Sequence, residues 1–323
     1  MSRKKKIGWV GMIALLLNLM SVYLFLQRNK LGNFTKQVSY EKLYSATEIR
    51  RSGIQRWKKI MDEYPADQVS AGRKLSQANA GISEQDLPLD KMIKIGAWLN
   101  RSFRKCPSGH PSSSFQKLSL TNQYQAAAEA RTPVWCVTYA SQFLFFCAIN
   151  GIVCRCIEST NDANHHMIVE CFIPELQQWV FADIQNNVIY GKDKNGKFLN
   201  TVDLLYRNIG KDTAAFSAYG QLNSDSMQVV PRDAYAGIWK NYFDSSTLLR
   251  FYYKIDPDNI YTFREKLIRY ISPQPWFETF SLKKISNLAF YMRILFLCGG
   301  LLATIFYFSL LLRRASIRQN PTV

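Results

Sequence analysis

The chain has 323 residues, 47% of them hydrophobic, and a net charge of +17 from 41 Lys and Arg against 24 Asp and Glu. This length allows one sizeable globular core with accessory elements. Six basic residues lie in residues 1–30 and three in 313–323, which leaves 32 basic against 24 acidic residues between them, a net of +8. This excess is diffuse and no nucleic-acid motif accompanies it, so we exclude nucleic acid as a partner. Anionic lipid headgroups or an acidic polymer would suit it.

Two uncharged apolar stretches, residues 7–26 and 294–312, have the length needed to cross a bilayer. Basic residues precede the first stretch and no small-residue cleavage site follows it, so it predicts a retained anchor rather than a signal peptide. Arg313 and Arg314 directly follow the second stretch. The positive-inside rule then predicts a two-pass membrane protein with both termini in the cytoplasm and an extracytoplasmic domain between the spans.

The first half of the region between the spans is predicted to be mainly helical. Residues 37–63 suggest an imperfectly amphipathic helix or a pair of helices, whereas residues 64–86 are polar and predict a linker or loop. Residues 90–103 begin with a capping Asp and continue with helical apolar spacing. Residues 123–130 predict a short Ala-rich helix that leads towards Cys136.

Cys136 is predicted to lie in the first turn of a helix. The apolar residues after it follow the spacing of one helix face, and Asn150-Gly151 supplies a stop signal; they are Val137, Ala140, Phe143, Leu144, Cys147 and Ala148. Free backbone N–H groups and the positive end of the helix dipole favour an anion at this position. The thiol of Cys136 is therefore biased towards thiolate.

Three strands are predicted after this helix, at residues 152–158, 166–173 and 179–183. If the second turn is the two-residue Pro174-Glu175, Asp183 lies opposite His166. If it is a four-residue loop centred on Glu175-Leu176, Asp183 lies opposite Ile168. Both registers place Asp183 on the face of His166, and an odd loop length would reverse that face.

These elements predict a nucleophile with a base and an acid that orients it. Thiol acyl transfer needs a base to accept the thiol proton and a carboxylate to hold that base. His165 competes with His166 but faces the opposite way, and we favour His166 because it shares a face with Glu170 and Asp183. The backbone N–H of Cys136 is a natural oxyanion donor. The second donor stays open, with Gln123 and Gln125 upstream of the helix.

This stretch resembles the core of the transglutaminase-like superfamily, a papain-related fold. The resemblance is carried by Trp135-Cys136, Gly151-Ile152, Arg155, His166, Glu170, Trp179-Val180 and Asp183. It covers about a sixth of the chain closely, and residues 90–200 more loosely. Trp135 departs from the Gly found near the Cys in many members, and Ile168 from an aromatic that often follows the His. The resemblance implies an α+β fold in which a catalytic helix packs on an antiparallel sheet, with Cys136, His166 and Asp183 as the catalytic residues.

The residue patterns, together with the resemblance for the core, divide the chain into five segments. Its predicted segments are a cytoplasmic tail and transmembrane helix at 1–30, a helical linker region at 31–89, the transglutaminase-like core at 90–200, an aromatic-rich extension at 201–285, and a transmembrane helix with a basic tail at 286–323.

The function implied is that of a membrane-anchored, cysteine-dependent protease, amidase or acyltransferase. Its substrate would be a protein or peptide amide associated with the cell envelope, its other partner membrane lipid, and no cofactor is expected. One alternative is an inactive domain of the same fold that binds an envelope polymer or a membrane complex. A zinc site is disfavoured, because Cys154-x-Cys156 lacks the usual Cys-x-x-Cys spacing; its ligands would come from Cys154, Cys156, Cys171, His165 and His166. Of the seven cysteines, Cys298 lies in the second span, and five remain in the middle of the chain if Cys136 is a free nucleophile. An odd number cannot all pair, and Cys147 lies on the apolar face of its helix, which argues against a disulfide scaffold.

Overall fold

The computed structural model describes residues 3–27, 36–44, 64–130, 132–161, 164–209, 216–221, 226–231, 234–252, 267, 270–271, 278–282 and 287–319. The chain divides into two compact units. One comprises Met1–Gln37, Tyr261–Trp276 and Ile285–Val323, and the other comprises Val38–Ile260 and Phe277–Lys284. Of the helical region predicted at 37–63, the structure describes a short helix, α2 (Tyr40–Tyr44), next to the two-residue strand β1 (Lys36–Gln37). Residues 45–63 lie outside the described residues.

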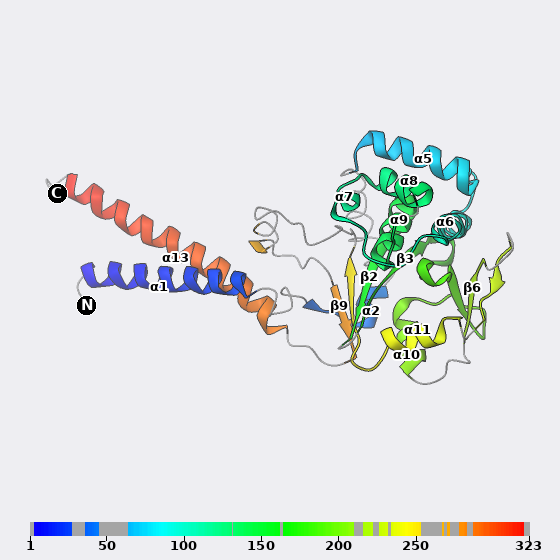
Figure 1. Ribbon diagram of the computed structural model, residues 1–323. Helices are drawn as coiled ribbons and strands as arrows, with labels where there is room; N and C mark the ends of the chain where they lie inside the picture. Colours follow the sequence, from blue (N-terminus) through cyan, green and yellow to red (C-terminus); the bar gives the residue numbers. More distant parts are fainter. Residues whose placement is uncertain are drawn as a thin grey trace. The chain divides into compact units, whose positions relative to one another are not determined.

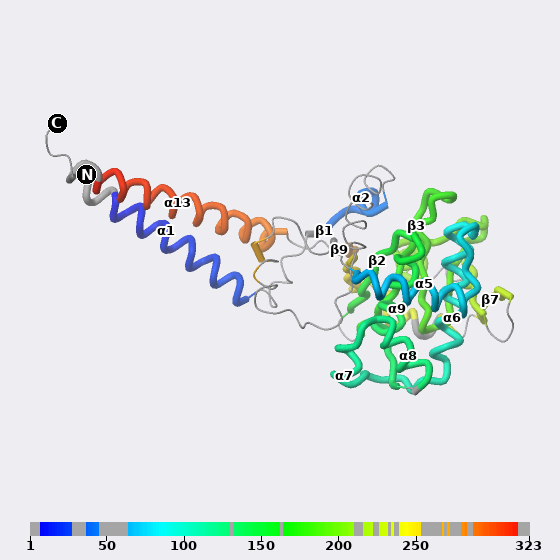
Figure 2. The backbone as a smooth tube through the Cα atoms, turned by 90° about the horizontal axis from the view of Figure 1, so that it is seen from above, coloured from blue at the N-terminus to red at the C-terminus, as the bar shows by residue number. Residues whose placement is uncertain are grey.

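The first unit is built on two long helices, α1 (Arg3–Leu26) and α13 (Leu288–Gln319), which lie side by side and antiparallel (Figures 1 and 2). Their stretches Ile7–Leu26 and Leu288–Ala315 are long and apolar enough to cross a membrane. A Cβ on Gly11 would meet the ring of Tyr307 at 2.8 Å, and Asn18 Nδ2 donates to Thr304 Oγ1 over 3.0 Å. Small residues and interhelical hydrogen bonds of this kind join helices within lipid.

The second unit contains antiparallel sheets. The larger one runs in the order β9 (Glu278–Ser281), β8 (Leu248–Tyr252), β2 (Val153–Thr160), β3 (His165–Ile173) and β4 (Gln178–Ala182). The smaller one consists of β5 (Tyr190–Asp193), β6 (Phe216–Gly220) and β7 (Gln228–Val229). Antiparallel sheets combined with packed helices confirm the α+β class. β8 and β9 were not predicted, because their part of the chain shows no clear alternation.

The register of β3 and β4 decides between the predicted turns. Ile173 lies opposite Gln178, so the loop contains four residues, and the 3₁₀ turn Pro174–Leu176 occupies most of it. Val169 lies opposite Ala182 at the other end of the ladder. Continuing this register by one residue places Asp183 opposite Ile168, as the four-residue alternative predicts.

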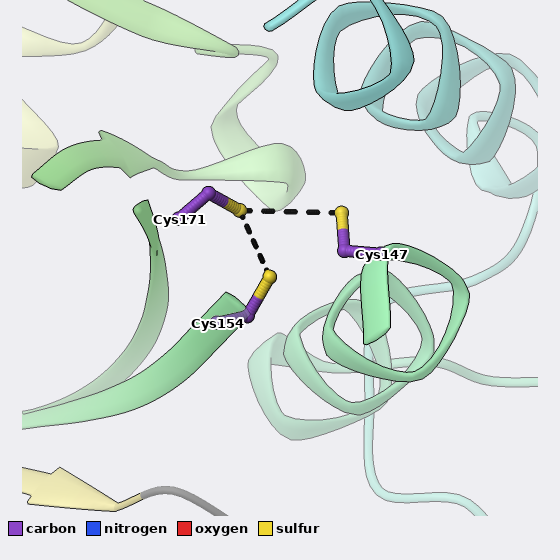
Figure 3. A group of neighbouring side chains, drawn as sticks. All are labelled: Cys147, Cys154 and Cys171. Carbon is purple, nitrogen blue, oxygen red and sulfur yellow. Dashed lines mark hydrogen bonds between the residues drawn. The ribbon is translucent and has the colours of Figure 1, made fainter. Parts of the chain in front are cut away.

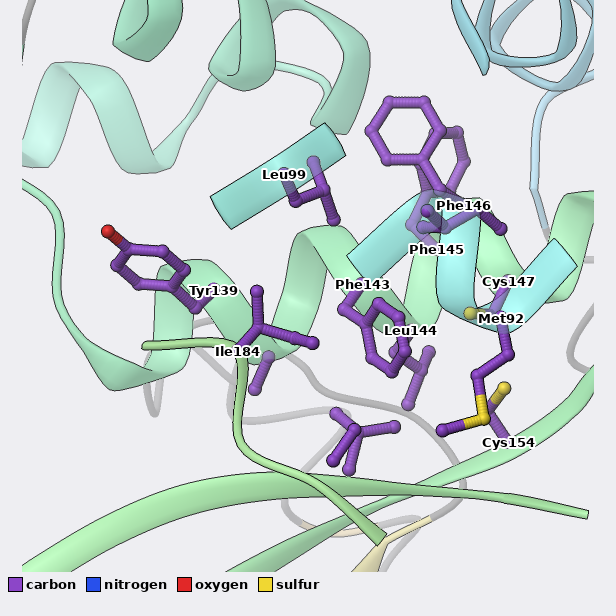
Figure 4. Close-up of a cluster of buried hydrophobic side chains, with 14 of the residues drawn as sticks. Met92, Leu99, Tyr139, Phe143, Leu144, Phe145, Phe146, Cys147, Cys154 and Ile184 are labelled. Atoms are coloured by element: carbon purple, nitrogen blue, oxygen red, sulfur yellow. The ribbon is translucent and has the colours of Figure 1, made fainter. Parts of the chain in front are cut away.

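Helices cover both faces of the larger sheet (Figure 1). One face carries α5 (Ala66–Ala80), α6 (Pro88–Phe103), α8 (Leu120–Ala130) and α9 (Cys136–Ile149), with the four-residue α7 (Ser113–Gln116) beside α8. The other face carries α10 (Thr201–Ile209) and α11 (Ala236–Tyr242). The central helix is α9: every residue in it except Val137 is buried, and its aromatic side chains fill the core shown in Figure 4. This burial on all sides holds the start of α9 in a fixed place.

The prediction of a loop at residues 64–86 was wrong, because α5 occupies most of that range. The helix contacts the core through small residues, with Gly72 and Ser76 buried. A Cβ on Gly72 would meet Ile149 Cδ1 at 2.6 Å, so the absence of a side chain lets α5 approach α9. Small residues buried along a narrow stripe leave most of a helix polar, and such a helix is easily mistaken for a loop.

Candidate active site

Cys136 is the first residue of α9. Trp135 precedes it in an extended conformation, and the Trp135 side chain makes no capping hydrogen bond. The approach to the helix is fixed by the loop before it, because Gly109 N donates to Val134 O over 3.1 Å and Val134 N to Pro107 O over 2.9 Å. The uncapped N–H groups of the first turn are therefore available to an anion beside the Cys136 thiol.

His166 lies near the start of β3 and is only 2% exposed. Its Nε2 is 3.0 Å from Asp183 Oδ2, and the Cys136 side chain lies close enough to help raise the pKa of the ring. Because Asp183 engages Nε2, Nδ1 is the nitrogen left for the thiol. The ring of Tyr242 stacks on the imidazole, with centroids 4.5 Å apart and planes at 19°. His166 is thus held between a thiol and a carboxylate, in a fixed plane.

Asp183 follows β4 and is 1% exposed. The backbone closes a tight loop after it, because Asp183 N donates to Val188 O over 2.7 Å and Val188 N returns to Asp183 O over 3.0 Å. This loop turns Asn186 back on the carboxylate, where its Nδ2 donates to Oδ2 over 2.7 Å. Trp239 Nε1 donates to the same oxygen over 3.0 Å. Two donors in addition to His166 therefore orient this carboxylate.

The electrostatics of the pair favour ionised partners. Burial acts to lower the pKa of His166, but the charge and hydrogen bond of Asp183, with a contribution from Cys136, raise it to about 10. Burial acts to raise the pKa of Asp183, but His166, Asn186 and Trp239 together hold it below its ordinary value of 3.8. An imidazolium held beside a thiol stabilises the thiolate.

His165 takes no part in this arrangement. Its side chain is 46% exposed, and its Nδ1 lies 3.2 Å from Glu158 Oε1. His166 is therefore the histidine that bonds Asp183 and whose pKa responds to Cys136.

Arg155 and Glu170 form a buried ion pair, with side chains 1% and 0% exposed. Arg155 Nε and Nη2 donate to Glu170 Oε2 over 2.8 and 2.7 Å. The other carboxylate oxygen accepts from Tyr44 Oη over 2.9 Å and from Thr201 N over 2.6 Å. Of the two alternatives for this pair, a structural ion pair or surface groups, the structure thus supports the first. The pair joins β2, β3, α2 and the start of α10.

Several neighbours of the site were missed from the sequence. Asn186 carries no catalytic signal in the sequence, and no periodicity marks Trp239 or Tyr242. The upstream glutamine Gln123 donates instead to the backbone carbonyls of Gln116 and Leu118, over 3.3 and 3.0 Å. That amide has a structural role.

The metal alternative does not coincide with this site. Among the described residues, the group of side chains close enough to hold an ion is Cys147, Cys154 and Cys171. Neither His165 nor His166 belongs to it. Cys156 is also outside the group, and its Sγ donates to Ile168 O over 3.3 Å.

No family model matches the chain, and no curated protein does. Among solved structures, the chain is similar to that of a candidate cysteine protease from Cytophaga hutchinsonii, at 18% identity and a TM-score of 0.31. The match covers 63% of this chain and 60% of that one.

Proposed function

We propose that the chain is a membrane-anchored thiol enzyme of transglutaminase-like type that acts on an amide bond through Cys136, His166 and Asp183. The observation that carries the proposal is the buried imidazole of His166, which lies 3.0 Å from the carboxylate of Asp183 and within electrostatic reach of the Cys136 thiol. A histidine needed only for packing would not require an acid held by two further donors.

The reaction begins with Cys136 as the thiolate, paired with a His166 imidazolium that already carries the proton at Nδ1. The thiolate attacks the amide carbonyl carbon, and the uncapped N–H groups at the start of α9 stabilise the oxyanion that forms. The C–N bond then breaks as His166 returns the proton to the leaving amine, which leaves a thioester on Cys136. Water or a second amine resolves that thioester, with His166 accepting the proton of the attacking group.

Asp183 acts on the imidazole rather than on the substrate. Its carboxylate accepts from His166 Nε2, which leaves Nδ1 to exchange the proton with the thiol, and it stabilises the imidazolium. Tyr242 is a positioning residue whose ring holds the imidazole plane. Burial raises the pKa of the Tyr242 phenol, and the charges of Cys136 and Asp183 raise it further, so the hydroxyl lies within electrostatic reach of both.

The location follows from the two helices with membrane-spanning length and their basic flanks. In this proposal both termini are cytoplasmic and the catalytic unit is extracytoplasmic. Its substrate is a protein or peptide amide of the cell envelope, and membrane lipid surrounds the spans.

The test compares the reactivity of two thiols in one protein. Cys106 is partly exposed, whereas Cys136 is buried at 9% exposure, so accessibility alone predicts that Cys106 reacts faster. A short pulse of iodoacetamide at neutral pH, followed by denaturation and peptide mapping, gives both rates. We expect Cys136 to react at least about tenfold faster, because a thiolate is the reactive form. A Cys136 no faster than Cys106 would favour an inactive binding domain.

A further inference from the structure

Three cysteines meet in the core behind the site. Cys147 comes from α9, Cys154 from β2 and Cys171 from β3, and their sulfurs all lie within 4.8 Å of one another (Figure 3). Cys171 Sγ is 3.2 Å from Cys154 Sγ and 4.0 Å from Cys147 Sγ. All three side chains are buried among apolar neighbours, at 0–1% exposure. The catalytic proposal uses none of them.

Two of these residues are placed for a covalent bond. Cys154 and Cys171 lie directly opposite each other in the antiparallel ladder of β2 and β3. Directly opposite residues have Cα atoms roughly 4.5–5.5 Å apart, inside the range of disulfides. The sulfurs are already 3.2 Å apart, so a bond of about 2.05 Å needs them to approach by roughly a further 1.2 Å. Rotation of the side chains supplies this movement without a shift of either strand.

A metal ion suits the cluster less well. Three thiolates about 2.3 Å from one ion lie roughly 4 Å apart, so the closer pair would have to separate. An ion also needs three deprotonated thiols. Burial raises the pKa of both Cys147 and Cys154, whereas for Cys171 burial is outweighed by the hydrogen bonds of these two thiols, which lower the pKa to about 6, so one thiol of the three ionises readily. Among the described residues, no His, Asp or Glu joins the group as a fourth ligand. A disulfide, by contrast, buries no charge.

We propose that Cys154 and Cys171 form a disulfide as the domain folds, while Cys147 stays a thiol. The oxidant is a disulfide-carrying protein of the compartment outside the cytoplasm. The two cysteines lose two electrons and two protons, and the carrier disulfide takes them up to become a dithiol. Because the folded core is closed to a protein oxidant, the exchange takes place before the strands are covered. The inference rests on the extracytoplasmic placement proposed above, and not on catalysis by Cys136.

The disulfide links β2, which carries Arg155, to β3, which carries Glu170 and His166. It closes a chain segment of 16 residues between Cys154 and Cys171, and a loop of that size stabilises mainly by constraining the unfolded chain. We expect reduction to lower the melting temperature of the protein by about 5–10 °C.

The test uses the full-length protein, purified from membranes in detergent without reductant and denatured in the presence of iodoacetamide. We expect five of the seven cysteines to be alkylated, and a linked peptide that joins Cys154 to Cys171. Cys156→Ala is the matched control, since Cys156 is a buried cysteine on the same face of β2. In this variant the linked peptide should still form, and reduction should still lower the melting temperature. The double variant Cys154→Ala/Cys171→Ala should lose both.

The proposal is overturned if all seven cysteines are alkylated, if the link joins a different pair, or if elemental analysis finds stoichiometric copper or zinc in protein without the link. Refolding the reduced protein in glutathione buffer then shows whether the predicted compartment or the predicted pairing is at fault. A link formed only in this buffer contradicts the extracytoplasmic placement, whereas no link in either sample contradicts the pairing. The iodoacetamide reactivity of Cys136 is measured separately, so failure of the disulfide and failure of the thiol enzyme remain distinguishable.

Discussion

The indole N–H of Trp239 donates to Asp183 Oδ2 over 3.0 Å, across 56 residues of chain. The bond connects α11 with the end of β4, and Trp239 is 1% exposed. A carboxylate that accepts from His166, Asn186 and Trp239 on one oxygen has little freedom to turn. The orientation of His166 therefore depends on a residue from the aromatic-rich region beyond the predicted core.

Trp239→Phe removes this donor and keeps most of the aromatic volume. We expect the iodoacetamide labelling rate of Cys136 near pH 6 to fall by roughly 3–10-fold, because a hydrogen bond to a charged group contributes about 1.5–3 kcal/mol and two donors to Asp183 remain. The measurement is a labelling time course at fixed pH.

Trp179→Phe is the control for that variant. Trp179 is also buried, but its Nε1 has no hydrogen-bond partner among the residues that the structure describes. The same change of side chain there should leave the labelling of Cys136 unaltered. Equal effects of the two substitutions would mean that the lost aromatic volume, and not the bond to Asp183, is responsible.

The sequence predicted those parts of the fold whose patterns are local. The helix that starts at Cys136 and the three strands after it follow from periodicity, and alternation placed Asp183 on the face of His166. The choice between a two-residue and a four-residue loop could not be made, because Pro174-Glu175 and Glu175-Leu176 are both acceptable turn centres. Trp239 and Tyr242 reach the site only through long-range packing, and the sequence around them contains no local pattern that indicates it.

The pair of His166 and Asp183 should make stability depend on pH in both directions. The raised pKa of His166 stabilises the fold below its ordinary value of 6.5, and this contribution is lost as the pH rises through about 10. The lowered pKa of Asp183 stabilises it above 3.8, and this contribution is lost as the pH falls through the lowered value. The stabilisation from His166 and the stabilisation from Asp183 are therefore both complete only between pH 3.8 and pH 6.5.

Asp183→Asn should therefore reduce the free energy of unfolding most between about pH 4 and 6.5, by roughly 3–5 kcal/mol, because it removes one charge of a buried pair. The difference from wild type should shrink towards pH 10 and towards pH 3. Chemical unfolding at a series of pH values measures it. A difference in unfolding free energy that stays constant from about pH 3 to about pH 10 would show that the charges of His166 and Asp183 do not stabilise each other.

Arg155→Met should destabilise the protein by about 3–5 kcal/mol, because it leaves the Glu170 carboxylate charged and buried without its cation. Glu170→Leu combined with Arg155→Met removes both charges and should recover a large part of this loss. Chemical unfolding of the two single variants and the double variant gives the coupling energy. If the double variant loses the full sum of both single effects, the pair is not coupled.

The topology is tested with a reporter that is active only outside the cytoplasm. Fused after residue 200 it should be active, and fused at the C-terminus it should be silent, because the positive-inside rule predicts that Arg313 and Arg314 keep that end of the second span in the cytoplasm. The reverse pattern would contradict the two-pass topology with cytoplasmic ends.

The most direct test of the central claim is the pH dependence of iodoacetamide labelling at Cys136, located by peptide mapping, in wild type and in His166→Ala. We predict that wild-type labelling persists well below the ordinary thiol pKa of about 8.5 and that it collapses at those pH values in the variant. Labelling that follows an ordinary thiol and does not change in His166→Ala would contradict a Cys136–His166 pair and the thiol enzyme built on it.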